Sequence, residues 1–127
     1  MTKLVRILHV EDDPAIQQVA KIALEAVGGF EVCSCSGGPE ALEQFPNFQP
    51  QLVLLDVMMP GMDGPETLRQ LQQRYEMSDI PVVFMTAKVQ SHEVQSYKEL
   101  GATEVVVKPF DPMTLSERIR QIWQARH

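Results

Sequence analysis

The sequence predicts a doubly wound α/β domain, in which a five-stranded parallel sheet carries helices on both faces. Two observations lead to this fold class. The chain has 127 residues, which is enough for one domain with its own core. Short apolar runs alternate five times with amphipathic segments. Strict alternation of strand and helix places the strands parallel in one sheet that is covered on both faces.

The first strand is expected over residues 4–10, which are mostly apolar. Asp13-Pro14 then predicts the start of a helix, with Asp13 as the N-cap and the proline at the first helical position. Apolar residues recur at helical spacing as far as Val27, and the pair Gly28-Gly29 ends the helix.

The second strand is expected over residues 30–35, followed by a short helix that opens at Gly38. We expect this helix to end before Pro46, because proline cannot donate a helical hydrogen bond. Residues 52–55 form a continuous apolar run, as is typical of a strand buried on both faces. A turn-rich segment leads to a third helix that begins at Pro65.

Residues 80–85 predict the fourth strand, with Pro81 near its beginning, where proline is tolerated. Residues 91–100 form a polar, weakly amphipathic helix that Gly101 closes, and residues 105–107 form the fifth strand. Asp111-Pro112 is expected to cap the last helix.

Composition excludes several classes of protein. Seventeen acidic against eleven basic residues give a net charge of −6 without any basic cluster, so we expect no direct binding to nucleic acid. No apolar run approaches the ~20 residues of a membrane span, and we see no secretion signal. Cys33 and Cys35 are spaced unfavourably for a disulfide, so we expect reduced thiols and a cytoplasmic protein without membrane contact.

The residues that follow the strands point to a binding site, because parallel α/β sheets bind ligands at the carboxyl ends of their strands. Carboxylates follow the first and third strands, a hydroxyl follows the fourth, and an ammonium follows the fifth: Glu11, Asp12, Asp13, Asp56, Thr86 and Lys108. Taken singly, each fits a helix cap, a turn or a solvated charge. Together they predict one polar site at this edge.

The chemistry of these groups favours a divalent cation and phosphoryl transfer. Carboxylates ~4 Å apart repel by about 4 kcal/mol per pair at an effective dielectric of 20, so they take up a proton or bind a cation. Oxygen ligands open to water suit Mg²⁺, and the absence of histidine and cysteine from the set disfavours zinc. Asp56 is the natural nucleophile, while Thr86 and Lys108 can hold phosphoryl oxygens.

Four segments together closely resemble the receiver domain of two-component response regulators: residues 10–13, 56–64, 85–87 and 108–110. The resemblance covers roughly residues 4–124. It implies a (βα)5 flavodoxin-like fold of strand order 2-1-3-4-5, as in chemotaxis regulators. It also implies a single receiver domain over residues 1–127 with no output domain, because few residues follow the last helix.

The resemblance implies a role for each residue of the site. Asp56 would accept a phosphoryl group from a histidine kinase or a histidine phosphotransfer protein, and the chain would turn over no metabolite. Mg²⁺, with Mn²⁺ as an alternative ion, would be held by Glu11, Asp12, Asp56 and the backbone carbonyl of Met58, with Asp12 a direct ligand. Thr86 and Lys108 would contact phosphoryl oxygens. The Lys108–Pro109 peptide would be cis, and Asp13 would be a helix cap.

The resemblance also implies how the signal leaves the domain. A downstream protein would bind the fourth helix, the fifth strand and the fifth helix, or the phosphoryl group would pass onward in a relay. Most receivers carry an aromatic residue three positions before the lysine, whereas this chain has Val105. We therefore expect signalling through residues 87–95 and the fourth helix, without the inward movement of a ring.

Three alternative functions stay open on the sequence. An aspartyl-phosphate phosphatase of the haloacid-dehalogenase kind needs a second aspartate two residues after the nucleophile, where this chain has Met58. Flavin or nucleotide binding needs a phosphate-binding loop after the first strand, where the acidic residues 11–13 would repel phosphate. A receiver that acts without phosphorylation is the third, because Val105 departs from the family pattern.

Overall fold

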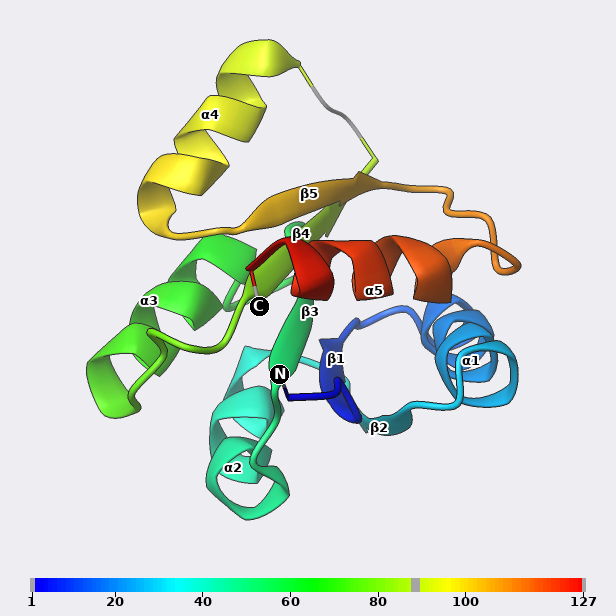
Figure 1. Ribbon diagram of the computed structural model, residues 1–127. Coiled ribbons are helices and arrows are strands. Elements are labelled where there is room, and N and C mark those ends of the chain that lie inside the picture. Colours follow the sequence, from blue (N-terminus) through cyan, green and yellow to red (C-terminus); the bar gives the residue numbers. More distant parts are fainter. Residues whose placement is uncertain (1, 88–89, 127) are drawn as a thin grey trace.

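The computed structural model describes residues 2–87 and 90–126. Its five strands form one parallel sheet of order β2-β1-β3-β4-β5, and the helices lie on both faces, as the sequence predicts (Figure 1). The strands are β1 (Arg6–Val10), β2 (Glu31–Cys35), β3 (Leu52–Asp56), β4 (Val82–Thr86) and β5 (Glu104–Val107). The helices are α1 (Pro14–Ile22), η1 (Ala23–Val27), α2 (Gly38–Phe48), α3 (Gly64–Arg74), α4 (Ser91–Leu100) and α5 (Leu115–Arg126).

Two hydrophobic cores sandwich the sheet. On one face α1, η1 and α5 pack against alternate strand residues such as Ile7 and Leu54. On the other face α2 and α3, with part of α4, pack against residues of opposite parity such as Leu8 and Leu55. All five residues of β3 are buried, because this central strand is covered from both sides.

The beginning of α1 follows the predicted capping pattern. Asp13 Oδ1 accepts hydrogen bonds from the backbone N–H groups of Ala15 (2.8 Å) and Ile16 (3.3 Å), and Pro14 occupies the first helical position. The end differs, because the last turn is the π-helical segment η1. Ser116 Oγ of α5 donates to the Ala23 carbonyl at 2.7 Å, so the altered backbone of η1 is held by a neighbouring helix.

The prediction that the second helix ends before Pro46 is wrong, since α2 continues through this proline to Phe48. Pro46 removes the N–H that would have bonded to the Leu42 carbonyl. Tyr75, just after α3, supplies the missing donor: its hydroxyl donates to the Leu42 carbonyl at 2.8 Å, and its ring stacks on Phe45. A tertiary contact thus offsets the local cost of proline.

The last helix also differs from the prediction. Asp111 caps a turn, in which its carboxylate accepts from the Met113 N–H and its carbonyl accepts from Leu115, and α5 itself begins only at Leu115. The other predicted caps are confirmed: Gly101 adopts φ 117° at the end of α4, and Gly28 follows the end of η1.

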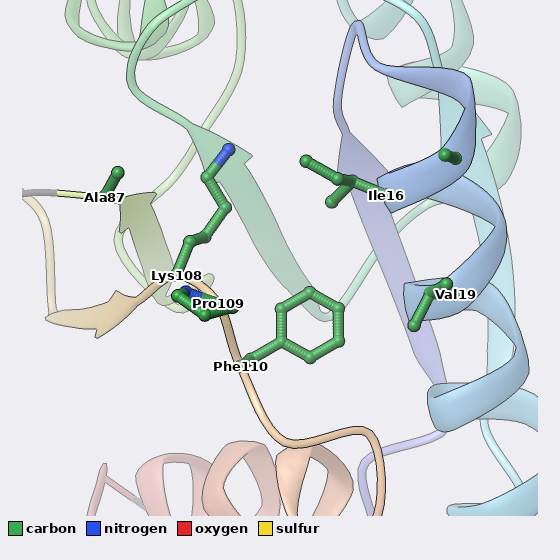
Figure 2. A pocket seen from close by; sticks show the side chains of 7 residues that line it. Ile16, Val19, Ala87, Lys108, Pro109 and Phe110 are labelled. Carbon is green, nitrogen blue, oxygen red and sulfur yellow. The ribbon is translucent and has the colours of Figure 1, made fainter.

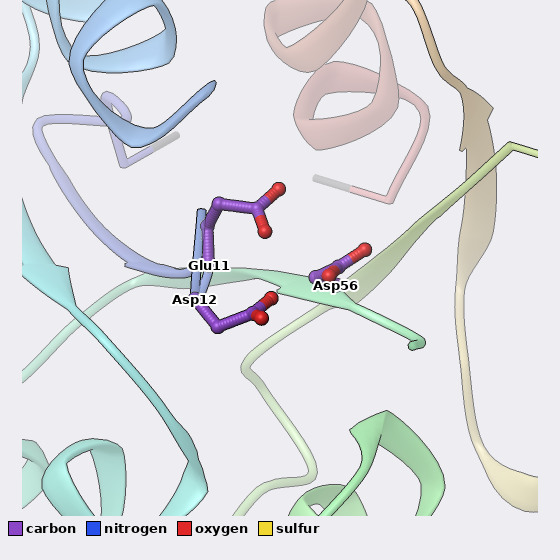
Figure 3. Close-up of side chains that lie close together, drawn as sticks. All are labelled: Glu11, Asp12 and Asp56. Carbon is purple, nitrogen blue, oxygen red and sulfur yellow. The ribbon is translucent and has the colours of Figure 1, made fainter. Parts of the chain in front are cut away.

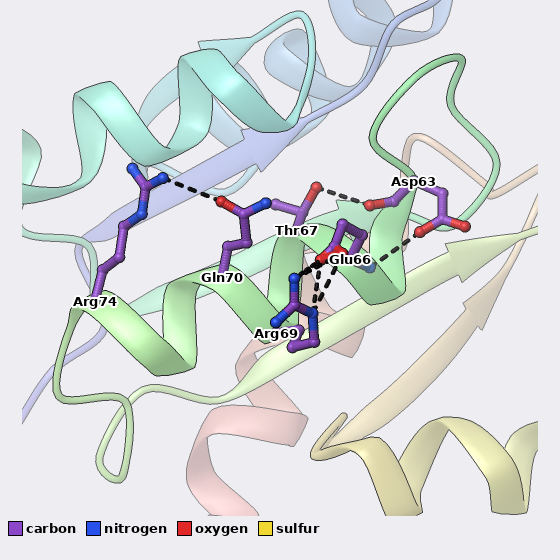
Figure 4. A network of polar contacts seen from close by, with 6 residues as sticks. All are labelled: Asp63, Glu66, Thr67, Arg69, Gln70 and Arg74. Carbon is purple, nitrogen blue, oxygen red and sulfur yellow. Dashed lines mark hydrogen bonds and ion pairs between the residues drawn. The ribbon is translucent and has the colours of Figure 1, made fainter.

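The start of α3 lies directly against the end of β3. Asp63 caps the helix by accepting from the Glu66 N–H at 3.0 Å, and its carbonyl accepts from the Thr67 hydroxyl (Figure 4). The Gly64 N–H donates to the Val57 carbonyl at 2.9 Å. A Cβ at Gly64 would lie 2.6 Å from the Asp56 carbonyl oxygen, so only glycine lets α3 begin this close to Asp56.

Candidate functional site

Three carboxylates meet at the carboxyl end of the sheet. Glu11 and Asp12 follow β1, and Asp56 is the last residue of the neighbouring β3. Each offers one oxygen, and these oxygens lie within 4.8 Å of one another (Figure 3). Glu11 is 1% and Asp56 2% exposed, while Asp12 is open to solvent. The predicted convergence of these acids is therefore confirmed.

Lys108 places its ammonium between the two buried carboxylates. Nζ lies 2.8 Å from Asp56 Oδ1 and 3.2 Å from Glu11 Oε1. Partial burial lowers the pKa of Lys108, but the hydrogen bond to Asp56 and the charge of Glu11 outweigh this effect and raise the pKa above its ordinary value. The side chain is therefore a permanent cation at neutral pH. The expected cis peptide between Lys108 and Pro109 is present.

The surroundings of Glu11 raise the pKa of its carboxyl group. Burial raises its pKa to about 7, and the charge of Asp56 acts in the same direction. The Asp13 N–H, which donates to Glu11 Oε2 at 3.2 Å, and the Lys108 ammonium oppose this shift. One ammonium thus offsets only part of the charge of three carboxylates, so the site favours a further cation.

The donor set fits Mg²⁺. It consists of carboxylate oxygens, of which those of Asp12 face water, and Mg²⁺ takes one or two carboxylates while keeping several waters. Met58, whose carbonyl was expected to add a ligand, lies two residues after Asp56 in the segment between β3 and α3, with its side chain 76% exposed.

Thr86 ends β4, next to the strand that carries Asp56. Met85 is the register partner of Asp56, so Thr86 lies one residue beyond it at the same sheet edge. The Thr86 carbonyl accepts from the Lys108 N–H at 2.8 Å, which fixes the start of the segment that carries the lysine. The structure therefore brings all the predicted strand-end groups to one edge, and Asp13 acts as a helix cap.

An apolar groove of about 470 Å³ borders this site (Figure 2). One wall comes from α1, and the other comes from the segments after β4 and β5. The lining residues are Ala15, Ile16, Val19, Ala87, Lys108, Pro109 and Phe110. Sequence reasoning missed the groove, because Ile16 and Val19 have the spacing of core residues, yet Val19 is 43% exposed.

Sequence reasoning also missed Gln17. Its side-chain amide donates to the carbonyls of Glu11 at 3.0 Å and Cys35 at 3.3 Å. Nothing in the sequence distinguishes it from the adjacent Gln18, which is exposed. Which of the two glutamines reaches these carbonyls depends on the side of α1 that faces the strand ends.

The sequence matches the response regulator receiver domain family over residues 7–120. It is 38% identical over 122 residues to the transcriptional regulatory protein CseB of Streptomyces coelicolor, covering 96% of this chain and 50% of that protein. It is 39% identical to the DNA-binding response regulator MtrA of Mycolicibacterium smegmatis, covering 91% and 49%. The chain therefore spans about half the length of the curated relatives it matches.

Solved structures agree with this assignment. Chemotaxis protein CheY4 of Vibrio cholerae superposes with a TM-score of 0.87 at 28% identity, over 94% of this chain and 99% of that one. A CheY-like receiver domain protein of Methanospirillum hungatei gives 0.83 at 29% identity, over 98% and 97%.

The fold, the acidic strand-end site and these matches define the class: the chain belongs to the receiver domain family of two-component response regulators. Receiver domains are regulatory phosphoacceptor domains that bind Mg²⁺ through acidic residues and interact with histidine kinases and downstream effectors. Among the helices of residues 2–87 and 90–126, none has the length and apolar character needed to cross a membrane.

Proposed function

We propose that Asp56 is the phosphoacceptor of this domain and takes a phosphoryl group from a histidine kinase or a histidine phosphotransfer protein. The observation that carries the proposal is the arrangement of Asp56, which is buried at the end of β3 beside Glu11 and Asp12, with Lys108 Nζ at 2.8 Å. An Asp56 oxygen would attack phosphorus as the bond from phosphorus to the donor imidazole breaks. The imidazole would then take up a proton, and Asp56 would become an acyl phosphate.

The surrounding residues would hold the charges that develop in this transfer. Asp12 and Asp56, with the Met58 carbonyl and Glu11 nearby, would hold Mg²⁺ or Mn²⁺, which supplies positive charge to the phosphoryl oxygens. Lys108 would move from the carboxylates to a phosphoryl oxygen, as its flexible stem allows. Thr86 would donate a hydrogen bond to another oxygen. Burial of Asp56 would limit access of water to the site.

The test of Asp56 uses intact mass. Wild type incubated with Mg²⁺ and acetyl phosphate is expected to gain one phosphoryl group, whereas Asp56→Asn gains none. Asp63→Asn is the matched control, because it alters an exposed aspartate of the same loop that only caps α3. Phosphorylation of Asp56→Asn, or loss of it in Asp63→Asn, would contradict the assignment.

The protein donor is proposed to cover the groove beside Lys108. The groove is continuous with the site through Lys108, and its exposed apolar wall on α1 suits the side of a partner helix. Val19→Asp is expected to slow transfer from a phosphorylated kinase or phosphotransfer protein by about tenfold, the effect of losing one contact of moderate importance. Transfer from acetyl phosphate should stay unchanged.

Val27→Asp is the matched control for this experiment. Val27 is 47% exposed on η1 and does not line the groove. An equal loss in both variants would contradict docking in the groove, as would slowed transfer from acetyl phosphate in Val19→Asp.

The output is proposed to leave through α4, β5 and α5, either as a contact with a downstream protein or as a relay of the phosphoryl group. Leu100 on α4 and Val107 on β5 are about half exposed, so this side offers apolar contacts. Because the domain has a net charge of −6, we propose that it makes no direct contact with nucleic acid or membrane. The free thiols of Cys33 and Cys35 support a cytoplasmic location.

Helix α4 is proposed to be the element that moves. None of its residues is buried, and it reaches the core through Val94 and through Tyr97, whose ring meets Phe84 edge-on with ring centroids 5.2 Å apart. Phe84 is the register partner of Val105, so apolar side chains fill this region without an aromatic residue on β5. Residues 88 and 89, which precede α4 in the segment expected to move, lie outside the described residues.

Amide chemical shifts test the movement of α4. Beryllofluoride with Mg²⁺, a mimic of the phosphoryl group, is expected to shift the signals of residues 91–100 as well as those of the site. Shifts confined to the residues around Asp56 would contradict this route of signalling.

A further inference from the structure

Glu11 and Asp12 follow β1 and lie beyond its last paired residue. The parallel ladders of β1 with β2 and β3 end at Val10. The Glu11 N–H still donates to the Cys35 carbonyl at 2.9 Å, but the Glu11 carbonyl lies beyond the ladder. Because Glu11 is only 1% exposed, its carbonyl needs a partner from the protein.

Gln17 supplies this partner from the second turn of α1. Its half-buried side chain donates from Nε2 to the Glu11 carbonyl at 3.0 Å and to the Cys35 carbonyl at 3.3 Å. Its backbone N–H donates to the Asp13 carbonyl at 2.9 Å. The backbone bond belongs to the regular pattern of the helix, whereas the side-chain bonds are specific to Gln17 and join the ends of β1 and β2 to α1.

We infer that Gln17 is a positioning residue for the cation site. Glu11 and Asp12 must keep their carboxylates close to Asp56 although the three groups repel one another. The exposed Asp12 follows directly on the carbonyl that the Gln17 side chain holds, so this restraint presents the ligand in place before the cation arrives. The inference rests on the proposed function, because it assumes that these acids hold the cation.

The contacts of Gln17 lie outside the cation site itself. Its amide reaches backbone carbonyls and leaves the carboxylate oxygens to the ion, Lys108 and the Asp13 N–H. Residues in such an outer position typically change metal affinity by about 10–100-fold when they are replaced. The hydrogen bonds of Gln17 reach neither Asp56 nor Lys108, so the chemical step at saturating Mg²⁺ should be preserved.

The experiment compares Gln17→Met, which keeps the length of the side chain and removes its donor, with the neighbouring Gln18→Met. The Kd for MgCl₂ alone is measured from amide chemical shifts, with no phosphodonor present. Gln17→Met is expected to raise this Kd about tenfold, while Gln18→Met leaves it at the wild-type value. At saturating Mg²⁺, phosphorylation of Gln17→Met by acetyl phosphate should approach the wild-type rate.

Leu71→Ala serves as a control for general loss of stability, because it opens a cavity at a fully buried position on α3. An unchanged Kd in Gln17→Met, or an equal rise in Leu71→Ala, would overturn the inference. A rate that stays low at saturating Mg²⁺ would overturn it too. Failure of the wild type to bind Mg²⁺ would instead refute the proposed cation site, so the two failures are distinguishable.

Discussion

Replacing Lys108 by methionine is expected to slow phosphorylation of Asp56 by acetyl phosphate about 100-fold or more at saturating Mg²⁺. Loss of one preorganised donor to developing negative charge typically costs about 10²–10³ in rate. Lys108 is in place before the reaction, because its ammonium is held 2.8 Å from Asp56 and 3.2 Å from Glu11. Methionine keeps most of the stem and removes the ammonium, with its charge and its hydrogen-bond donors.

A time course of intact mass measures this effect. Lys98→Met is the matched control, since Lys98 on α4 pairs with Glu104 at 3.7 Å on the surface and with none of the three acids of the site. We expect its rate to equal that of the wild type. A Lys108→Met protein that is phosphorylated as fast as the wild type would show that Lys108 only neutralises the acids in the resting domain.

His9→Leu is expected to make the free energy of unfolding of the domain much less sensitive to acid. His9 is fully buried on β1, and neither ring nitrogen has a hydrogen-bond partner among the described residues. Burial, together with the charge of Lys108, lowers the pKa of His9 from 6.5 to about 4. Near pH 6 His9 therefore binds a proton in the unfolded chain but not in the folded one. The free energy of unfolding falls as the pH drops from about 6.5 to 4.

The size of this loss is about 3 kcal/mol, since each unit of pKa difference is worth about 1.4 kcal/mol. Glu11 acts in the opposite direction, because its pKa is raised to about 7 in the fold, so its contribution to stability grows as the pH falls. The pH dependence of the free energy of unfolding of the wild type therefore contains both effects. The difference between His9→Leu and the wild type isolates His9.

Urea unfolding at about pH 7.5 and about pH 4 measures that difference. The free energy of unfolding of His9→Leu relative to the wild type is expected to rise by about 3 kcal/mol between the two conditions. His92→Leu, which changes an exposed histidine at the start of α4, should show no such rise. A difference that is independent of pH would mean that His9 is protonated in the folded domain.

Much of the fold could be predicted from the sequence because its signals are local. Buried strands are continuous apolar runs, as residues 52–55 of β3 are, and the Asp13-Pro14 pair marks a helix start through its own chemistry. The passage of α2 through Pro46 could not be predicted in this way. The donor that makes it tolerable is the hydroxyl of Tyr75, a residue from another part of the chain.

The site shows the same division. The proximity of Glu11, Asp12, Asp56 and Lys108 follows from the rule that parallel strands gather their carboxyl ends at one edge, and the structure confirms it. The groove and the role of Gln17 depend on how α1 is rotated against the sheet. Spacing alone assigns Val19 to the core, whereas packing leaves it 43% exposed in the wall of the groove.

A crystal structure of the domain with Mg²⁺ and beryllofluoride tests most directly that these groups form one phosphoacceptor site. We predict beryllofluoride on an Asp56 oxygen, with Lys108 and Thr86 in contact with its fluorines. We predict one Mg²⁺ ligated by Asp12, Asp56 and the Met58 carbonyl. An ion bound elsewhere, or beryllofluoride absent from Asp56 in crystals that contain Mg²⁺, would contradict the account.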